Sequence, residues 1–273
     1  MGKHSERVIE PLVGVFDSHS HINAPEFDGD RDAVIERMRT SGMAGAVVVA
    51  CDRPEAASMI ELVERHRGFL AGAWALHPEY EDREEVTVDE VVAVCSHSAV
   101  CAVGETGLDY HWCKGDLSWQ RARFERHIEA AQKLDKPLII HARESESDAL
   151  DILEKTDARR TGFVLHCFGG TPDDARRCVA LGGHLSVTGV VTFKNADNLR
   201  EIVREIPLEA LMIETDCPYM APVPMRGRRC EPSYVAAVAR EIARVKGLTP
   251  EIVAQATTQN ALRFFRLNAF SQH

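Results

Sequence analysis

The chain has 273 residues, of which 45% are hydrophobic, and this is enough sequence to bury one large core. Asp and Glu number 42 against 32 Lys and Arg, so the formal net charge is −10. This excess excludes a protein that coats nucleic acid with a generally basic surface. A polyanionic substrate would therefore have to be held by a local basic patch or by bound metal cations.

Eight cysteines are scattered along the chain, and no two of them form a C-x-x-C pair. This pattern favours reduced thiols in a cytoplasmic protein over a disulfide framework. No stretch approaches 18 consecutive apolar residues, and the first ten, MGKHSERVIE, carry charges where a secretory segment would be apolar. We therefore expect neither a secretory signal nor a membrane span.

Short apolar, β-branched runs that end in polar or Gly-rich residues recur along the chain, and they predict strands. Their centres are nearly all apolar, as in parallel strands that are buried on both faces. There are eight such runs: Val13 to Ile22, Ala44 to Cys51, Leu70 to Pro78, Val100 to Tyr110, Pro137 to Ser145, Gly162 to Gly170, Gly183 to Phe193 and Leu211 to Met220.

Helical patterns alternate with these runs, and the clearest spans Leu117 to Asp135. Apolar residues recur there every three or four positions, and Asp135-Lys136-Pro137 ends the pattern. The other predicted helices are Asp30 to Thr40, Glu55 to His66, Ser147 to Lys155, Pro172 to Leu181, Leu199 to Glu205, Ser233 to Lys246 and a final helix from Pro250 to Phe265 that would close the flank of the fold.

Eight strand–helix units in a chain of this length predict an α/β fold of the (β/α)8 TIM-barrel type with an additional C-terminal helix. A doubly wound open sheet is the alternative, but it usually has a Gly-rich phosphate fingerprint after its first strand, where this chain has DSHSH. We expect a single domain over residues 13–268, preceded by an N-terminal extension of residues 1–12.

Metal-ligating side chains stand at the ends of five of the predicted strands. In a (β/α)8 barrel these ends meet at one mouth, where active sites lie. The side chains are His19 and His21 after the first strand, Glu105 after the fourth, His141 after the fifth, His166 after the sixth and Asp216 after the eighth.

His19 and His21 are two residues apart on a strand, so both side chains point to the same face. A lone H-x-H pair is more often a hydrogen-bonded pair in the core. Glu105 could instead pair with a buried arginine, which is the less favoured alternative, and Asp216 could cap the turn before Cys217-Pro218. Their convergence at one mouth favours ligation instead.

Two cations bridged by the Glu105 carboxylate would lie about 3.5–4 Å apart and would lower the pKa of a bridging water to near neutrality. Asp216 could then accept the proton of that water. Imidazole-rich sites suit Zn, Mn, Co or Ni better than Mg, which prefers oxygen ligands. The residues alone therefore predict a binuclear metallohydrolase in which Glu105 and Asp216 take part in catalysis.

Six motifs together resemble the TatD family of metal-dependent deoxyribonucleases. They are DSHSHI, GETGLDY, PLIIHARES, LHCFGG, ETDCPYMAP and TTQNALRFF, and they span almost the whole chain, from Val13 to Phe265. The resemblance implies a barrel related to the amidohydrolases. It also implies hydrolysis of phosphodiester bonds in single-stranded DNA or at DNA ends, in the 3′-to-5′ direction.

The resemblance also assigns ligands. His19 and His21 match the pair that binds a first metal together with Asp216, while Glu105 matches the carboxylate shared by both ions. His141 and His166 match the histidines of a second metal.

The family's Gly-x-His-Pro motif corresponds to AWALHPE, which makes His77 a group near the substrate phosphate or beside the ligands, although Ala75 replaces the glycine. Thr106 stands where the family commonly has an aliphatic residue, and Cys230 where an asparagine is usual. These two changes leave the six ligands in place.

Candidate substrate contacts are less specific. Arg226, in RGRRCEP, and Arg143, just after His141, could bind phosphates at the mouth. The alternative for the RGRRCEP loop is a solvated run of charges. The alternative for Arg143 is a structural ion pair with Glu105 or Asp148. Aromatic residues that follow the strand ends could stack on bases, although such residues are more often packing groups. They are Tyr110, Trp112, Phe168 and Tyr219.

Two other functions fit the same residues. Ester or amide hydrolysis, including removal of a D-amino acid from an aminoacyl-tRNA, would use the same activated water, and some members of the family that the chain resembles perform it. A general amidohydrolase is less favoured, because the fourth strand lacks the lysine that many of them carbamylate. A non-catalytic barrel that keeps its metal for stability would be expected to have lost at least one ligand.

Overall fold

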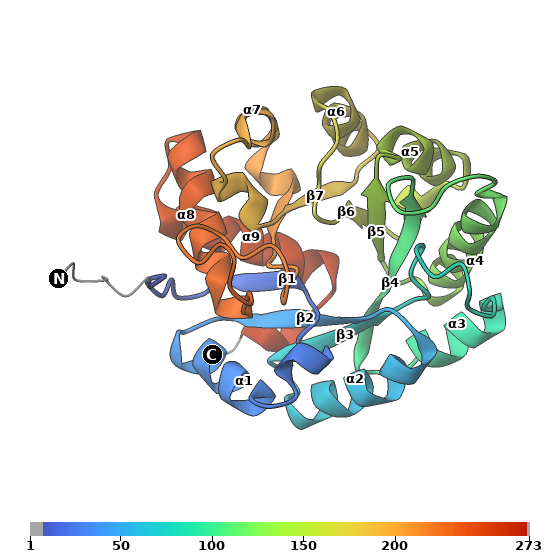
Figure 1. The fold of residues 1–273 in the computed structure, drawn as a ribbon, viewed down its shortest axis with the longest axis horizontal. Helices are drawn as coiled ribbons and strands as arrows, with labels where there is room; N and C mark the ends of the chain where they lie inside the picture. The colour runs from blue at the N-terminus through green and yellow to red at the C-terminus, as the bar shows by residue number, and fades with distance from the viewer. Residues whose placement is uncertain (1–7, 272–273) are drawn as a thin grey trace.

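The computed structural model describes residues 8–271, which form an eight-stranded parallel sheet in the order β1 to β8 with helices around it (Figure 1). Every predicted strand segment contains one of these strands. Their bounds are β1 Phe16–Ser20, β2 Gly45–Ala50, β3 Leu70–Trp74, β4 Val100–Asp109, β5 Leu138–Arg143, β6 Phe163–Leu165, β7 His184–Val187 and β8 Leu211–Ile213.

Each predicted helix agrees with an observed one to within two residues at both ends. One further helix, α3, was not predicted. Their bounds are α1 Arg31–Thr40, α2 Arg53–Arg65, α3 Val88–Cys95, α4 Ser118–Leu134, α5 Glu146–Lys155, α6 Pro172–Ala180, α7 Asp197–Glu205, α8 Val235–Lys246 and α9 Pro250–Phe264.

The first and last strands meet through backbone hydrogen bonds just beyond their C-terminal ends. The Asp216 N–H donates to the His19 carbonyl at 3.0 Å, and the His21 N–H donates to the Cys217 carbonyl at 2.9 Å. Helix α9 contacts both β1 and β8, so the predicted final helix covers this seam. The (β/α)8 barrel is therefore confirmed, and the open doubly wound sheet is wrong.

Apolar side chains from alternate strand positions fill the barrel interior. Phe16, Val47, Ile139 and Met212 belong to this cluster, and each is at most 1% exposed. Phe270, in the short 3-10 helix η6 (Asn268–Ser271), packs edge-on against Phe16 with ring centroids 5.9 Å apart. The C-terminal segment thus covers the start of β1, and the polar residues that follow the strands lie at the opposite end of the barrel.

The predicted N-terminal extension, residues 1–12, is described only in part, since residues 1–7 lie outside the described residues. The following residues run beside α8, where Arg240 donates to the carbonyls of Glu10 and Pro11 at 2.8 and 2.9 Å. Leu12 is buried. Within residues 8–271, no helix combines the length and the apolar character that crossing a membrane requires.

Candidate metal centre

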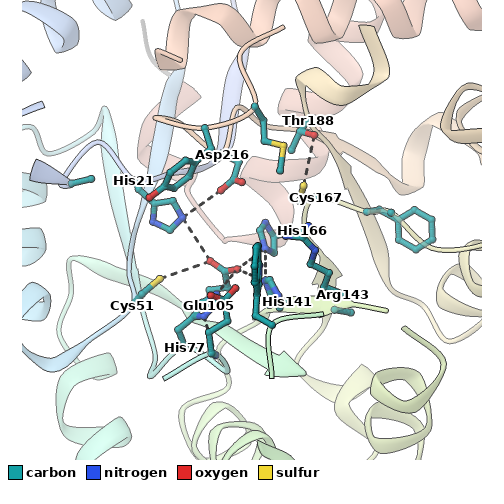
Figure 2. Close-up of a pocket in the computed structure, with 18 of the residues that line it drawn as sticks. His21, Cys51, His77, Glu105, His141, Arg143, His166, Cys167, Thr188 and Asp216 are labelled. Atoms are coloured by element: carbon teal, nitrogen blue, oxygen red, sulfur yellow. Dashed lines mark hydrogen bonds and ion pairs between the residues drawn. The ribbon is translucent and has the colours of Figure 1, made fainter. Parts of the chain in front are cut away.

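A cavity of about 840 Å³ opens at the C-terminal ends of the strands, and the side chains at its base point toward one another (Figure 2). Five of the six predicted ligands line it: His21, Glu105, His141, His166 and Asp216. The sixth, His19, is fully buried just beneath them. The structure therefore brings together all six side chains that the strand ends predicted.

Glu105 lies at the centre of this group, and the glycines on either side of it explain how it can. The pairing of β4 with β5 shifts register between Val103 and Thr106, as at a β-bulge, and this re-aims the carboxylate. A Cβ at Gly104 would lie 2.6 Å from Ile139 Cβ, and one at Gly107 would lie 2.0 Å from the His141 carbonyl oxygen. The sequence G-E-T-G thus permits β4 to approach β5 closely around the buried carboxylate.

One set of donor atoms gathers around Glu105 Oε2. His19 Nε2 lies 3.2 Å from this oxygen and 3.1 Å from His21 Nε2. Asp216 Oδ1 lies 3.4 Å from His21 Nε2 and 3.8 Å from His19 Nε2. We call His19, His21 and Asp216 the first triad, since their donor atoms all lie within 4.8 Å of one another.

A second set gathers around Glu105 Oε1. His166 Nε2 lies 2.6 Å from this oxygen, and His141 Nδ1 lies 2.8 Å from it. We call Glu105, His141 and His166 the second triad, whose donor atoms also lie within 4.8 Å of one another. The two oxygens of one carboxylate thus face two different groups of imidazoles, which is the arrangement that a bridging ligand requires.

In three of these histidines, the ring nitrogen that faces away from Glu105, here called the outer nitrogen, has a hydrogen-bond partner of its own. The inner nitrogen is the one that faces the Glu105 carboxylate. His21 Nδ1 lies 3.0 Å from the Val49 carbonyl oxygen, and His141 Nε2 lies 2.9 Å from Asp109 Oδ2. His166 Nδ1 lies 3.2 Å from Glu214 Oε1. Each of these oxygens can accept a hydrogen bond from an N–H on the outer nitrogen, and in that tautomer the inner nitrogen presents its lone pair to the centre, as in histidines that ligate metals.

The electrostatics of the cluster also favour positive charge at its centre. Burial lowers the pKa of His21 and of His141, but carboxylates outweigh it and raise these pKa values to about 9 and about 8. Burial likewise raises the pKa of Glu105, yet the surrounding imidazoles, first of all His166, hold it well below its ordinary value. A site whose carboxylates hold protons on its imidazoles also attracts divalent cations, which would bind in place of those protons.

His77 lies directly beside the Glu105 carboxylate. Its Nε2 atom is 3.1 Å from Glu105 Oε1, and its Nδ1 atom accepts the backbone N–H of Glu79 at 3.2 Å. Cys51, at the end of β2, has its Sγ atom 3.8 Å from Glu105 Oε2. The Glu105 carboxylate is thus enclosed by side chains from β1, β2, β5, β6 and the loop after β3.

The two candidate arginines have different surroundings. Arg143 lines the cavity, and its guanidinium carbon lies 5.5 Å from the centre of the Trp112 ring. It does not pair with Asp148, whose Oδ2 atom accepts from Arg121 and from the Tyr110 hydroxyl, each at 2.7 Å. Arg226 is absent from the residues that line the cavity, and its guanidinium lies 4.3 Å from the Phe193 ring centre. Arg143 is therefore the better placed of the two.

Two exposed aromatic side chains and several carboxylates line the cavity. Trp112 is 63% exposed and Tyr219 is 57% exposed, and both line the cavity, whereas Phe168 is buried. Arg143 is the one Lys or Arg among the lining residues. The carboxylates of the lining are Glu26, Glu55, Glu79, Glu105, Glu144, Glu146 and Asp216.

The sequence interpretation did not single out three residues that touch the ligands: Asp109, Glu214 and Cys51. A signal for the first two was present, because Asp109 is four residues after Glu105 and Glu214 is two residues before Asp216, and side chains an even number apart share one face of a strand. The thiol at Cys51 offered no such periodic signal beyond its place at the end of a strand.

Comparisons with known proteins agree with this geometry. A family model described as TatD related DNase matches residues 16–266. The uncharacterized metal-dependent hydrolase YabD of Bacillus subtilis is 42% identical over 255 residues, which are 93% of this chain and 100% of that protein. A protein of Edwardsiella piscicida named 3'-5' ssDNA/RNA exonuclease TatD is 31% identical over 89% of this chain and 95% of its own.

The crystal structure of YJJV, a TatD homologue from Escherichia coli K12, superimposes with a TM-score of 0.85 at 29% identity and covers 92% of this chain and 98% of that one. The barrel thus agrees with the fold of this relative. The chain belongs to the TatD family of metal-dependent hydrolases.

Proposed function

We propose that the protein is a nuclease that hydrolyses phosphodiester bonds at the ends of single-stranded DNA with two divalent cations. The observation that carries this proposal is the division of donor atoms around Glu105, whose two carboxylate oxygens face the first and the second triad separately. His19, His21 and Asp216 would hold one cation, His141 and His166 the other, and Glu105 both. Zn, Mn, Co and Ni suit these imidazoles better than Mg.

When bound, two such cations polarise a phosphoryl oxygen and bring the pKa of a water near neutrality. The chain's own groups would perform the remaining steps. Asp216, whose pKa lies below its ordinary value because His21 and His19 outweigh its burial, is an anion that can accept a proton on its other carboxylate oxygen, since Oδ1 is the atom that faces His19 and His21. Arg143 would donate to phosphate oxygens from the edge of the cavity.

The acidic rim favours a substrate that reaches the centre with one end. A long strand laid across this mouth would pass several carboxylates and only one arginine. A terminal nucleotide would instead place one phosphate at the centre and its base near Trp112 or Tyr219. The relative named as a 3'-5' ssDNA/RNA exonuclease supports both the substrate class and the direction of cleavage.

The test is hydrolysis of a 3′-labelled and a 5′-labelled single-stranded oligonucleotide by purified protein with Mn²⁺ or Zn²⁺. We expect stepwise loss from the 3′ end that a chelator stops. The variants Glu105→Ala and His141→Ala should lose at least about 100-fold in rate, because each removes a ligand. His97→Ala, which changes a histidine outside the cavity, is the matched control and should keep full activity.

Cleavage that survives in Glu105→Ala would come from a contaminating nuclease and would contradict the proposal. A parallel reaction with D-aminoacyl-tRNA separates the alternative, since deacylation without DNA cleavage would assign the site to ester hydrolysis. Bound metal without turnover of either substrate would indicate a scaffold. We place the activity in the cytoplasm, a proposal supported by eight cysteines that are all free thiols.

A further inference from the structure

A carboxylate beneath the metal centre lies beside one histidine of each triad. Glu214 directly follows β8 and is fully buried. Its Oε1 atom accepts two hydrogen bonds, from His166 Nδ1 at 3.2 Å and from the backbone N–H of Cys167 at 2.7 Å. Its Oε2 atom is also buried, and it has no hydrogen-bond partner among the described residues.

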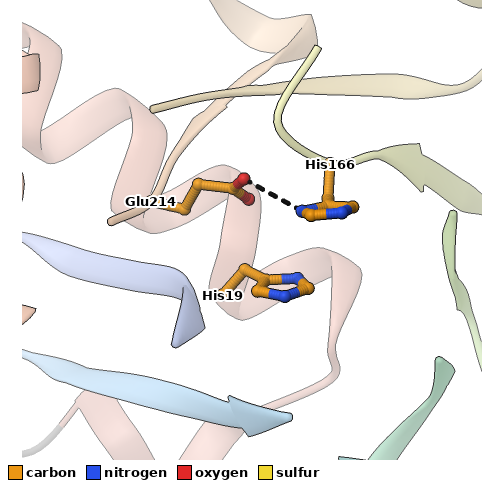
Figure 3. Close-up of side chains that lie close together, drawn as sticks. All are labelled: His19, His166 and Glu214. Carbon is orange, nitrogen blue, oxygen red and sulfur yellow. Dashed lines mark hydrogen bonds and ion pairs between the residues drawn. The ribbon is translucent and has the colours of Figure 1, made fainter. Parts of the chain in front are cut away.

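His19 has the complementary property. It is fully buried, and its Nδ1 atom has no hydrogen-bond partner within residues 8–271. Its ring stacks on that of His166 with centroids 4.0 Å apart and planes inclined by 12°, and Figure 3 shows both rings beside the Glu214 side chain. His19, His166 and Glu214 each offer one ligand atom within 4.8 Å of the others.

The two unpartnered atoms have opposite hydrogen-bonding character. If Nε2 of His19 presents its lone pair to a cation, the neutral ring carries its proton on Nδ1, which is then a donor. A buried N–H without an acceptor and a buried carboxylate oxygen without a donor both cost free energy. Both costs disappear if Oε2 of Glu214 accepts the His19 proton, directly or through one water molecule.

We propose that Glu214 is a positioning residue shared by the two metal sites, since it fixes the tautomer and ring orientation of His19 in the first triad and of His166 in the second. The other ligating histidines have separate supports: His21 has the Val49 carbonyl, and His141 has Asp109. Loss of Glu214 therefore weakens both sites at once, whereas loss of Asp109 weakens one. This inference rests on the proposed function, because it requires two cations.

The test is a calorimetric titration of metal-free protein with Co²⁺, followed in parallel by the visible absorption of the bound ion. Wild-type protein should bind two Co²⁺ ions. Glu214→Gln keeps the shape of the side chain but lacks the charge and the second acceptor oxygen, and it should bind both ions about 10–100-fold more weakly. Asp109→Asn is the matched control and should weaken one ion while leaving the other within about threefold.

We call this role of Glu214 the shared anchor. It is overturned if the wild type binds two Co²⁺ ions and Glu214→Gln weakens the binding of only one of them or of neither. The proposed function would then still stand. Fewer than two sites in the wild type would overturn the two-cation proposal and the anchor with it. Circular dichroism of the metal-free variants establishes that each one folds.

A second measurement uses only the wild type and does not depend on how a variant folds. Nitrogen-15 NMR of protein labelled at histidine and loaded with Zn²⁺ reports which ring nitrogen carries the proton. The shared anchor requires His19 and His166 both to be Nδ1–H tautomers with slowly exchanging protons. A His19 ring protonated at Nε2, or an Nδ1 proton that exchanges at the solvent rate, would overturn it.

Discussion

At the scale of single residues, the geometry of the candidate metal centre depends on glycines as well as on the side chains proposed as ligands. Gly107 has a φ of +143°, and a Cβ at this position would lie 2.0 Å from the carbonyl oxygen of His141. Any other residue there would have to push β4 away from β5. Glu105 and His141 lie on these two strands. The distance of 2.8 Å between Glu105 Oε1 and His141 Nδ1 therefore depends on the close approach of β4 to β5.

We therefore expect Gly107→Ala to lower the free energy of unfolding by about 3 kcal/mol, because backbone strain and overpacking add. Urea denaturation of the metal-free protein measures this loss. Gly29→Ala is the control, since nothing lies within 4 Å of a Cβ built there, and it should change stability by no more than about 0.5 kcal/mol. Equal effects of the two substitutions would contradict the argument.

Trp112 provides a prediction about substrate binding. Its ring is 63% exposed at the rim of the cavity, beside the Arg143 guanidinium. Stacking of a base on an aromatic ring contributes about 1–3 kcal/mol, so Trp112→Ala should raise KM for a single-stranded oligonucleotide roughly 5- to 150-fold. Trp112→Phe should recover most of this loss, and kcat should change little. Steady-state kinetics that give the same KM for both variants would contradict stacking.

The sequence predicts which side chains lie at the mouth of the barrel, because they stand at strand ends. It predicts less well how each of these side chains is oriented, because that depends on a contact with another residue. His141 is an example: its place after an apolar strand indicated a ligand, but not which ring nitrogen faces inward. That choice is made by Asp109, whose Oδ2 atom lies 2.9 Å from Nε2. Such a contact joins two strands, so the sequence of either strand alone does not specify it.

At the scale of elements, helix α4 contains a histidine that is part of the core and not of the metal centre. His127 is fully buried, and its Nδ1–H donates to the Arg123 carbonyl at 2.8 Å. Its Nε2 atom accepts the backbone N–H of Leu76 at 3.2 Å. Both contacts require the neutral ring, and burial lowers the pKa of His127 from 6.5 to about 4.

This shift predicts acid sensitivity. Below pH 6.5 the unfolded chain binds a proton at His127 that the folded protein does not bind until about pH 4, so stability falls as the pH falls through this window. Between roughly pH 7 and pH 5, wild-type protein should lose about 2 kcal/mol more than His127→Gln, whose amide has no proton to gain. Urea denaturation in the presence of a chelator measures both losses, and equal losses would contradict this origin.

The elements themselves were predictable to different degrees. The eight strands follow from apolar runs that are buried on both faces, and α4 follows from its regular apolar spacing. Helix α3, VDEVVAVC, was missed because β-branched residues favour strands and eight residues barely establish a period. Its start was nevertheless encoded, since the Thr87 hydroxyl accepts the backbone N–H of Glu90 at 3.2 Å as an N-cap.

At the scale of the whole molecule, the net charge of −10 and the carboxylates around the cavity act in the same direction. Both repel a polyanion, and Arg143 is the one permanently charged side chain of the lining that attracts it. Two bound divalent cations would add four positive charges at the base of the cavity, where little water screens them. Attraction for DNA is therefore expected to be concentrated at a single point and to depend on the metals.

This distribution predicts how binding responds to salt. A protein that neutralises Z phosphates of a single strand shows a slope of about −0.7Z when log K is plotted against log salt. Contact with one or two phosphates gives a slope of about −1 over roughly 50 to 200 mM salt, whereas a basic groove that contacts six or more phosphates would give −4 or steeper. Fluorescence anisotropy of an oligonucleotide with a phosphorothioate 3′ end, which resists cleavage, measures the slope, and a chelator should abolish binding in the same assay. A steep slope, or binding that persists after chelation, would show that the protein holds DNA by surface charge and not at the metal centre.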